Sequence, residues 1–284
     1  MEKPEVSIII PTYDSGKTLV SCLGSVDNQT YPSCEVIVVD NFSRDNTSEV
    51  ARSFKATVIQ QKCNAALARN IGIINSTSKY VLFLDSDQTL SPTVVEECVQ
   101  ICEKGSTEMV RVPEIFVGKG LWSSCSAIWK NYYQRVEQLY GAHRNILSGE
   151  PRFFVREKII SAGMFNSSLV WGEDYDLHQR LKKANVKEAA CRSGICHYEP
   201  TSVKGILMKN LYYSIHMPKF VYQTQRQILP KMLMHALLTL LEISKSNKSL
   251  VTIIGCTFLL GLKTYLMLIS LPLGLLLPIN KRGQ

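Results

Sequence analysis

Two carboxylates one residue apart end an apolar run at Val81–Asp87, which reads VLFLDSD. Side chains alternate along an extended strand, so Asp85 and Asp87 can leave a sheet on the same side at its carboxyl edge. Carboxylate oxygens arranged in this way suit a hard divalent cation, such as one bound to a diphosphate. Because many strands end in aspartate at a turn, the pair alone also leaves a structural role open.

Three further carboxylates follow or open predicted elements. Asp40 ends the run Glu35–Asp40, where it can accept paired hydrogen bonds from a nucleotide base edge or a ribose diol. It can equally cap the helix that follows or form a turn before it, because aspartate is favoured at N-caps and in turns. Glu173 and Asp174 open an amphipathic segment at Gly172–Ala184, where acids complement the helix dipole and a structural role is again open.

Strands and helices alternate through the first 84 residues. Short apolar, β-branched runs predict strands at Val6–Ile10, Glu35–Asp40, Thr57–Gln60 and Tyr80–Leu84. Helical periodicity predicts helices at Lys17–Val26, Arg44–Phe54 and Ala65–Ile74. Strands joined by helices predict an α/β fold with a mostly parallel sheet covered on both faces. Ligands of such sheets bind beyond the carboxyl ends of the strands, where Pro11–Asp14, Asp40 and Asp85 are expected.

The pattern loosens after Glu108, where short antiparallel strands are expected. A helix is predicted at about Leu121–Leu139, followed by an extended segment at Gly149–Val155. After the amphipathic helix at Gly172–Ala184, one strand is predicted at Lys187–His197. This second part of the chain is therefore expected to complete a mixed sheet.

Five motifs in order resemble those of an inverting family 2 glycosyltransferase with a GT-A fold. They read VSIIIPTYDSGKTLVSCLGSVDNQTYP, EVIVVDNFSRDNT, NAALARNIGI, YVLFLDSD and GEDYDLHQRL, and the resemblance covers about residues 4–200. It implies a GT-A fold, that of nucleotide-diphospho-sugar transferases, with a mixed, mostly parallel sheet flanked by helices. It also implies a UDP- or GDP-sugar donor and a divalent cation, Mg²⁺ or Mn²⁺.

The resemblance also implies roles on the donor side. Asp85, Asp87 and His197 would hold the cation, directly or through water, although His197 could instead be an ordinary edge or core histidine. The nucleotide-binding residues would be Pro11, Thr12, Tyr13, Asp40, Arg69, Asn70 and Ser86, the last being the spacer between the two acids. A structural ion pair is the alternative for Arg69.

On the acceptor side, the resemblance makes Asp174 the catalytic base. An inverting displacement needs a carboxylate that removes the proton of the acceptor hydroxyl, on the face opposite the diphosphate. Glu173 would orient the acceptor or the base. The remaining residues implied to contact acceptor or diphosphate are Trp171, which would stack on a sugar ring, Arg180 and Arg152.

The net charge of +8 belongs to the C-terminal part of the chain. Residues 204–284 hold ten Lys or Arg residues against a single acid, Glu242, whereas residues 1–203 are close to neutral. The same C-terminal part is strongly apolar. A basic and apolar segment favours a membrane surface with anionic lipid over a nucleic acid, so no nucleic-acid partner is expected.

The chain is predicted to have three parts: a GT-A domain at residues 1–200, an amphipathic basic region at 201–248 on the membrane surface, and an apolar anchor at 249–284. The segment Leu250–Leu271 is long enough to span a bilayer and contains one charge, Lys263. Lysines and arginines flank it on both sides, which also fits an in-plane helix pair. A buried helical pair is the alternative.

Localisation follows from the N-terminus and the cysteines. The N-terminal sequence MEKPEVS lacks an apolar signal core, and nine scattered cysteines without a C-x-x-C pair predict reduced thiols. A catalytic domain on the cytoplasmic face of a membrane is therefore expected.

These features predict a membrane-associated enzyme that transfers a sugar to a hydroxyl of a glycan, carried on a lipid. A polyprenyl-phosphate glycosyltransferase is the alternative enzyme, but its acceptor is already an anion and needs no base such as Asp174. An inactive relative that binds nucleotide or glycan as a membrane scaffold is the alternative outside enzymes.

Overall fold

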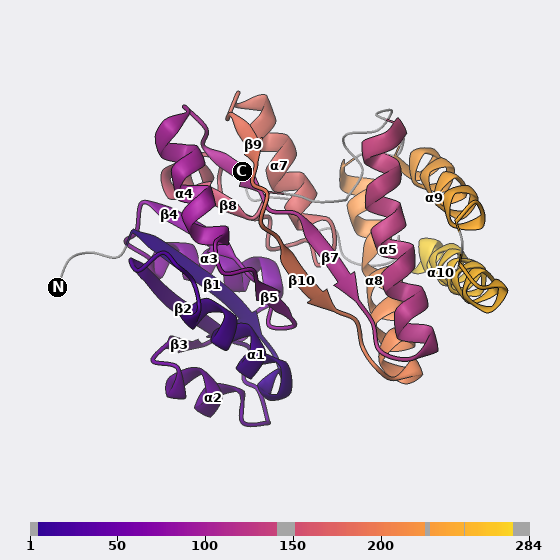
Figure 1. Cartoon of the computed structure of the whole chain (residues 1–284), viewed down its shortest axis with the longest axis horizontal. Coiled ribbons are helices and arrows are strands. Elements are labelled where there is room, and N and C mark those ends of the chain that lie inside the picture. Colours follow the sequence, from indigo (N-terminus) through magenta and orange to yellow (C-terminus); the bar gives the residue numbers. More distant parts are fainter. Residues whose placement is uncertain (1–4, 141–150, 225–227, 247, 275–284) are drawn as a thin grey trace. The chain divides into compact units, whose positions relative to one another are not determined.

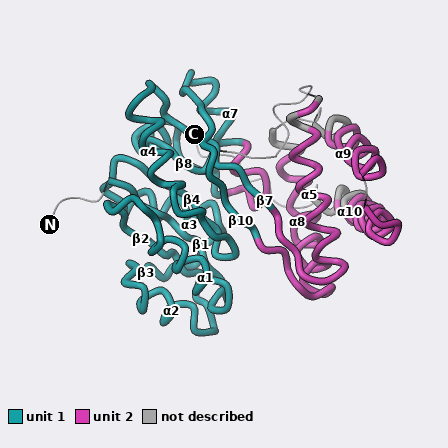
Figure 2. The backbone as a smooth tube through the Cα atoms, viewed as in Figure 1, with its two compact units in different colours: residues 1–115, 149–167, 176–197 teal, residues 116–148, 168–175, 198–284 magenta. Residues whose placement is uncertain are grey.

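The computed structural model describes residues 5–140, 151–224, 228–246 and 248–274. The chain forms two compact units that interleave along the sequence (Figure 2). The first, here called the sheet unit, comprises residues 1–115, 149–167 and 176–197. The second, the helical unit, comprises residues 116–148, 168–175 and 198–284.

A seven-stranded mixed sheet forms the sheet unit, in the order β3-β2-β1-β4-β8-β6-β9. Its parallel strands are β1 (Val6–Thr12), β2 (Cys34–Asp40), β3 (Thr57–Gln60) and β4 (Tyr80–Phe83). Next to β4 lie β8 (Phe153–Val155), antiparallel to both neighbours, then β6 (Met109–Arg111) and β9 (Glu188–Ala190). The predicted α/β fold with a mixed, mostly parallel sheet is confirmed.

Helices cover both faces of this sheet because the strands are apolar on both sides (Figure 1). Ile8 and Ile10 of β1 share a core with α1 (Gly16–Asp27) and α4 (Val94–Lys104). Ile9 and Phe83 share the opposite core with α3 (Ala65–Asn75), α6 (Arg156–Ser161) and the C-terminal part of α7 (Glu173–Lys183). A further helix, α2, spans Thr47–Ser53.

A second, three-stranded sheet has the order β5-β10-β7. It contains β5 (Gln88–Leu90), β10 (Ile195–Tyr198) and β7 (Glu114–Val117). The single strand predicted at Lys187–His197 is wrong, because β9 and β10 belong to different sheets. Gly194 lies at the break, where a Cβ atom would come within 2.8 Å of the Pro113 carbonyl oxygen. The chain therefore changes sheets immediately before it reaches His197.

The described part of the helical unit is built mainly from α5 (Leu121–Tyr140), α8 (Val203–Thr224), α9 (Ile228–Ser244) and α10 (Leu250–Gly274). Trp129 of α5, Ile206 of α8, Ile243 of α9 and Cys256 of α10 meet in one buried apolar cluster. The helix α5, predicted within a domain at residues 1–200, thus shares its core with the C-terminal helices. The three-part division of the chain stays a prediction.

No helix within the described residues is both long enough and apolar enough to cross a membrane. Of the anchor predicted at 249–284, residues 275–284 lie outside the described part of the chain. All nine cysteines lie within the described residues, and all are free thiols.

Candidate active site

Asp85, Ser86 and Asp87 form the turn that joins β4 to β5. The Asp85 N–H donates to Oε1 of Gln88 at 2.9 Å, and the Gln88 N–H donates to the Asp85 carbonyl at 3.0 Å. The Ser86 hydroxyl donates to that of Ser15 at 2.9 Å, which ties the turn to the loop after β1. Both carboxylates are therefore held at the carboxyl end of β4.

Two arginines hold the Asp85 carboxylate. Arg69 donates to Oδ1 at 2.9 Å and Arg152 donates to Oδ2 at 3.1 Å. Burial alone would raise the pKa of Asp85, but the two guanidinium groups outweigh burial and hold that pKa well below its ordinary value. The carboxylate is therefore ionised and largely neutralised by its partners, which suits a contact to a cation through water better than a direct bond.

Asp87 instead faces a histidine. Its Oδ2 lies 3.2 Å from Nε2 of His197, and about a third of its side chain is exposed. Antiparallel pairing of β5 with β10 causes this contact, because the register sets His197 opposite Gln88. Two residues 110 positions apart in the chain are thus brought together by strand register.

Glu114, at the start of β7, joins Asp85, Asp87 and His197 in one group of charged residues, which is called the acid cluster below. Its Oε1 lies 2.6 Å from Nδ1 of His197, accepts from Gln88 Nε2 at 2.7 Å, and lies 3.8 Å from a guanidinium nitrogen of Arg152. Burial opposes ionisation of Glu114, yet Arg152 and His197 lower its pKa below the ordinary value. Burial likewise disfavours charge on His197, but Asp87 and Glu114 raise its pKa overall.

The donor atoms of Asp87 and His197 fit a divalent cation. A metal-bound histidine usually has its other ring nitrogen hydrogen-bonded to a carboxylate, as His197 has to Glu114. Within the described residues, no group of three or more His, Cys, Asp or Glu side chains could hold a metal on its own. Mg²⁺ sites commonly use one or two carboxylates and take their other ligands from water and substrate phosphates. The residues therefore fit a cation shared with a diphosphate.

Among the nucleotide-binding candidates, Asp40 is fully buried. Its carboxylate accepts hydrogen bonds from Thr12, Ser43, Ser48 and Gln60. Burial would raise its pKa, but the hydrogen bonds from Ser43, Gln60 and Thr12 lower that pKa below the ordinary value. The N-cap of α2 is Asn46, so Asp40 does not cap that helix. It accepts from the Ser43 N–H in the turn before α2 instead, and nucleotide binding by Asp40 stays a prediction. Tyr13, just beyond Pro11 and Thr12, is 55% exposed.

The helix α3 carries Arg69 and Asn70 as adjacent buried residues. Asn70 donates to the Phe165 carbonyl at 2.8 Å and accepts from the Phe165 N–H at 2.9 Å. The Arg69 guanidinium lies 5.4 Å from the centre of the Phe165 ring, and it makes the ion pair with Asp85 that the sequence analysis considered. Asn70 therefore fixes the loop against which Arg69 is held.

Glu173 and Asp174 open α7 within the helical unit. Gly172 before them has φ +79°, and a Cβ atom there would lie 2.4 Å from the Phe220 ring, so only glycine fits. Trp171 packs edge-on against the same ring, with 5.2 Å between the two ring centres. Glu173 is buried and Asp174 is half-buried. Asp174 and Asp87 belong to different units, and the predicted opposition of base and cation stays a prediction.

Arg180 is engaged by the protein itself. Its guanidinium pairs with Asp176 at 2.9 Å and donates to the carbonyls of Ala162 and Met164, just beyond the end of α6. Its predicted contact with the diphosphate is untested. Arg152, predicted on the acceptor side, instead joins Asp85 to Glu114. Its neighbours therefore favour a role in the acid cluster.

Sequence reasoning missed Glu114 and Gln88. The available signals were an acid at the start of the apolar run EIFV and an amide directly after the acid pair. Both signals are common at strand ends. Only the pairing of β5, β10 and β7 brings Gln88 and Glu114 next to His197.

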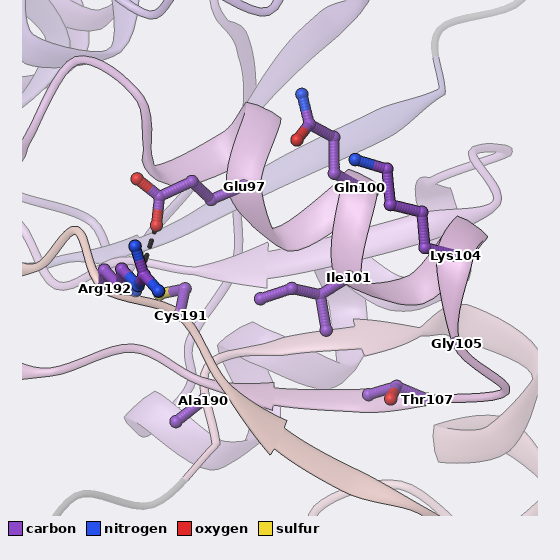
Figure 3. Close-up of a pocket in the computed structure, with 9 residues that line it drawn as sticks. All are labelled: Glu97, Gln100, Ile101, Lys104, Gly105, Thr107, Ala190, Cys191 and Arg192. Carbon is purple, nitrogen blue, oxygen red and sulfur yellow. Dashed lines mark hydrogen bonds between the residues drawn. The ribbon is translucent and has the colours of Figure 1, made fainter.

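A pocket of about 660 Å³ lies elsewhere on the sheet unit (Figure 3). It is lined by Glu97, Gln100, Ile101, Lys104, Gly105, Thr107, Ala190, Cys191 and Arg192. Glu97 accepts hydrogen bonds from the backbone N–H groups of Arg192 and Ser193, so its charge is used within the wall. None of the predicted site residues lines this pocket.

Residues 7–161, more than half of the chain, match the sequence profile of the family described as Glycosyl transferase family 2. The chain belongs to this family. The prediction of a glycosyltransferase domain is thereby confirmed. The family 2 match ends before the predicted base, Asp174, and before the C-terminal helices.

A curated relative of this family 2 chain is the glycosyltransferase GlyG of Streptococcus pneumoniae, which is 32% identical over 112 residues. The match covers 37% of this chain and 37% of GlyG, so it spans well under half of each protein.

Two solved structures share the fold. The mannosyltransferase PcManGT of Pyrobaculum calidifontis, in complex with GDP-Man and Mn²⁺, has a TM-score of 0.60 at 18% identity, covering 97% of this chain and 87% of its own. TarS of S. aureus, in complex with UDP-GlcNAc, has a TM-score of 0.58 at 16% identity, covering 78% and 74%. At these identities the likeness shows the GT-A-like fold.

Proposed function

We propose that this family 2 glycosyltransferase moves a sugar, with inversion, from a nucleoside-diphosphate sugar to a hydroxyl of a glycan acceptor. The observation that carries the proposal is the cluster at the carboxyl end of β4. There an ionised Asp85 is held by two arginines, beside an Asp87 whose oxygen lies 3.2 Å from His197. A carboxylate and an imidazole that converge in this way offer ligands to a cation bound to an anionic donor.

The donor is proposed to be a UDP- or GDP-sugar. Its diphosphate would meet a divalent cation, Mg²⁺ or Mn²⁺, held by Asp87 and His197, with Asp85 contacting that cation through water. When bound, such a cation neutralises the charge that develops on the departing diphosphate. The solved structures that contain GDP-Man with Mn²⁺ and UDP-GlcNAc support this class of donor. Tyr13 and Asp40 are proposed to contact the nucleoside.

Asp174 is proposed as the base that takes the proton of the acceptor hydroxyl. It is half-buried at the N-terminus of α7, where the helix dipole favours a carboxylate. Glu173 is buried beside it and is proposed to orient the base. Trp171, held against Phe220, would offer the rest of its ring to a sugar.

The acceptor is proposed to be a glycan linked to a lipid, reached from the cytoplasmic face of a membrane. The basic and apolar composition of residues 204–284 supports this location. A polyprenyl phosphate is the alternative acceptor.

A donor and acceptor screen tests the proposal. Purified protein with Mn²⁺ is given a panel of UDP- and GDP-sugars, and nucleotide release is followed with a glycan acceptor and, separately, with a polyprenyl phosphate. Asp174→Asn is expected to abolish transfer to hydroxyls while donor binding persists. Asp27→Asn, an exposed change of the same type on α1, is the matched control and should leave transfer unchanged. Transfer that survives in Asp174→Asn would contradict the role of the base.

A further inference from the structure

Large apolar side chains are exposed along α9 and α10 of the helical unit. Their exposed fractions range from 43% to 71%. They are Leu233, Met234, Leu237, Leu241, Leu250, Val251, Ile254, Phe258, Tyr265 and Ile269. These ten residues are called the apolar face below. Contiguous exposed apolar surface of this kind marks a site of interaction with protein or membrane.

The part of the apolar face on α10 is a regular stripe. Leu250, Ile254 and Phe258 follow one another at four-residue spacing, which places them on one side of the helix. The opposite side is used for packing, because Cys256 and Leu259 are buried in the core of the unit. One apolar side of α10 is therefore packed in the core, and the other is largely exposed, although Phe258 also lies against Trp122 of α5 with 5.5 Å between the ring centres.

The one charge of α10, Lys263, does not interrupt this stripe. It is half-buried, four residues after the buried Leu259, and interacts electrostatically with Lys130 of α5 and with Glu199. Since it is directed toward the interior of the helical unit, the stripe presents no charged side chain.

The part on α9 repeats the arrangement. His235, Thr239 and Ile243 are buried at four-residue spacing, while Leu233, Leu237 and Leu241 are exposed between them. The helices α9 and α10 contact each other, and both pack on α5. Figure 1 shows them together on one side of α5. Their exposed rows therefore belong to one surface of the helical unit.

Cations lie at the end of the apolar face. The connection between α9 and α10 contains Lys245, whose side chain is 65% exposed and pairs with Glu242 at 3.1 Å, and Lys248, which is also exposed. Over residues 204–284 there are ten basic residues and one acid, Glu242. A second copy docked on this face would bring two such positive regions together. A surface of anionic lipid would instead neutralise them, and its acyl chains would cover the apolar rows.

We propose that the apolar face binds an anionic lipid bilayer, with α9 and α10 lying in the plane of the membrane interface. Their inner sides stay packed on α5 and α8, so only the outer rows enter the boundary between headgroups and acyl chains. Lys245 and Lys248 contact the headgroups. The surface would hold the enzyme where lipid-linked acceptors are concentrated, a consequence that rests on the proposed function.

Vesicle flotation of the full chain tests this surface without donor, cation or acceptor, so it succeeds or fails independently of the transfer reaction. The probes are phosphatidylcholine vesicles with and without phosphatidylglycerol. Wild-type protein is expected to float with the anionic vesicles and to partition at least tenfold less onto the neutral ones. High salt should release part of the bound protein, because screening weakens the contribution of the lysines.

Two double variants separate the apolar contribution to lipid binding from the electrostatic contribution. Leu237→Glu with Ile254→Glu places charges on the apolar face at two residues outside the packed cluster, and should lower binding to anionic vesicles at least tenfold. Lys245→Glu with Lys248→Glu should remove the preference for anionic lipid. The matched control is Val20→Glu with Ile74→Glu, two exposed apolar residues of the sheet unit, and should bind as wild type does. Circular dichroism and thermal melting establish that each variant is folded.

Two results would overturn the inference. One is equal binding of wild type and Leu237→Glu/Ile254→Glu to anionic vesicles. The other is a wild-type dimer in light scattering, without lipid, that the same double variant converts to a monomer, because a second copy would then cover the face.

Discussion

One carboxylate held among cations in each unit can be compared, and the two differ in what surrounds them. Asp85 of the sheet unit is held by Arg69 and Arg152 and keeps 27% of its side chain exposed. Glu199 of the helical unit accepts from Ser126 at 2.8 Å, pairs with Lys130, and is only 2% exposed. Both are ionised, but only one borders solvent.

The comparison shows why the type of residue alone does not identify a site. Asp85 stands next to a second acid, Asp87, at an open strand end, so the cluster can accept a ligand. Glu199 has its hydrogen bonds made by α5, and its surroundings are side chains of the same core. We therefore expect changes in the first network to affect activity and changes in the second to affect stability.

Asp87→Ala should have the largest effect on activity. Losing one electrostatic contact of this kind lowers kcat/KM by about 10²–10³-fold. The free energy of unfolding should change little, since Asp87 is partly exposed. Steady-state kinetics with the donor found in the screen, together with Mn²⁺ titration, measure both the rate and the loss of cation affinity. Activity within a few fold of wild type would remove Asp87 from the site.

Lys130→Met should have the largest effect on stability. Removing one partner of a buried ion pair leaves Glu199 without its closest cation and costs about 3–5 kcal/mol. The lower figure is expected here, because Lys130 is 24% exposed. Urea unfolding followed by circular dichroism measures that loss. Donor binding per folded molecule should stay at the wild-type level. A loss of binding without a loss of stability would contradict the division of roles between the two networks.

The pH dependence of unfolding should sharpen the comparison. Burial would raise the pKa of Glu199, but Lys130 and Lys209 lower it overall, so the carboxylate is more acidic in the folded protein than in the unfolded chain. Its stabilising contribution is therefore complete above the unfolded pKa, about 4.3, and is lost as pH falls through the folded pKa. The stability difference between wild type and Glu199→Gln should shrink below about pH 4. If this stability difference grew as the pH fell, the folded protein would not lower the pKa of Glu199.

Glu157→Gln should have the smallest effect. Glu157 pairs with Arg156 at 2.9 Å, but its side chain is 73% exposed. Exposed pairs contribute about 0–1 kcal/mol to stability, so the free energy of unfolding should change by less than about 0.5 kcal/mol. Urea unfolding again provides the measurement. A larger change in the free energy of unfolding would show that side-chain exposure does not predict how much an ion pair stabilises this chain.

Local patterns were sufficient to predict the parallel half of the sheet. The strand at Thr57–Gln60 has the predicted bounds, and α3 and β4 differ from prediction by one residue at an end. Alternation of apolar runs with helical periods is a local signal, so it locates these elements without requiring which strands pair to be known. The turn at Asp85–Asp87 was predictable for the same reason.

Contacts between distant segments were not predictable. The chain at Lys187–His197 reads as one strand because its break at Gly194 serves a contact with Pro113, far away in sequence. Glu114 and Arg152 joined the acid cluster only through the pairing of β7 with β10 and of β8 with β4. The assignment of α5 to the helical unit likewise depends on the C-terminal helices that pack on it.

The most direct test of the central claim is the anomalous scattering of Mn²⁺ in a crystal of the protein with a nucleoside diphosphate. The account predicts an anomalous peak within bonding distance of an Asp87 carboxylate oxygen and Nε2 of His197, in contact with the diphosphate. A diphosphate bound at this sheet edge without such a peak, or a Mn²⁺ ion bound away from both side chains, would contradict it.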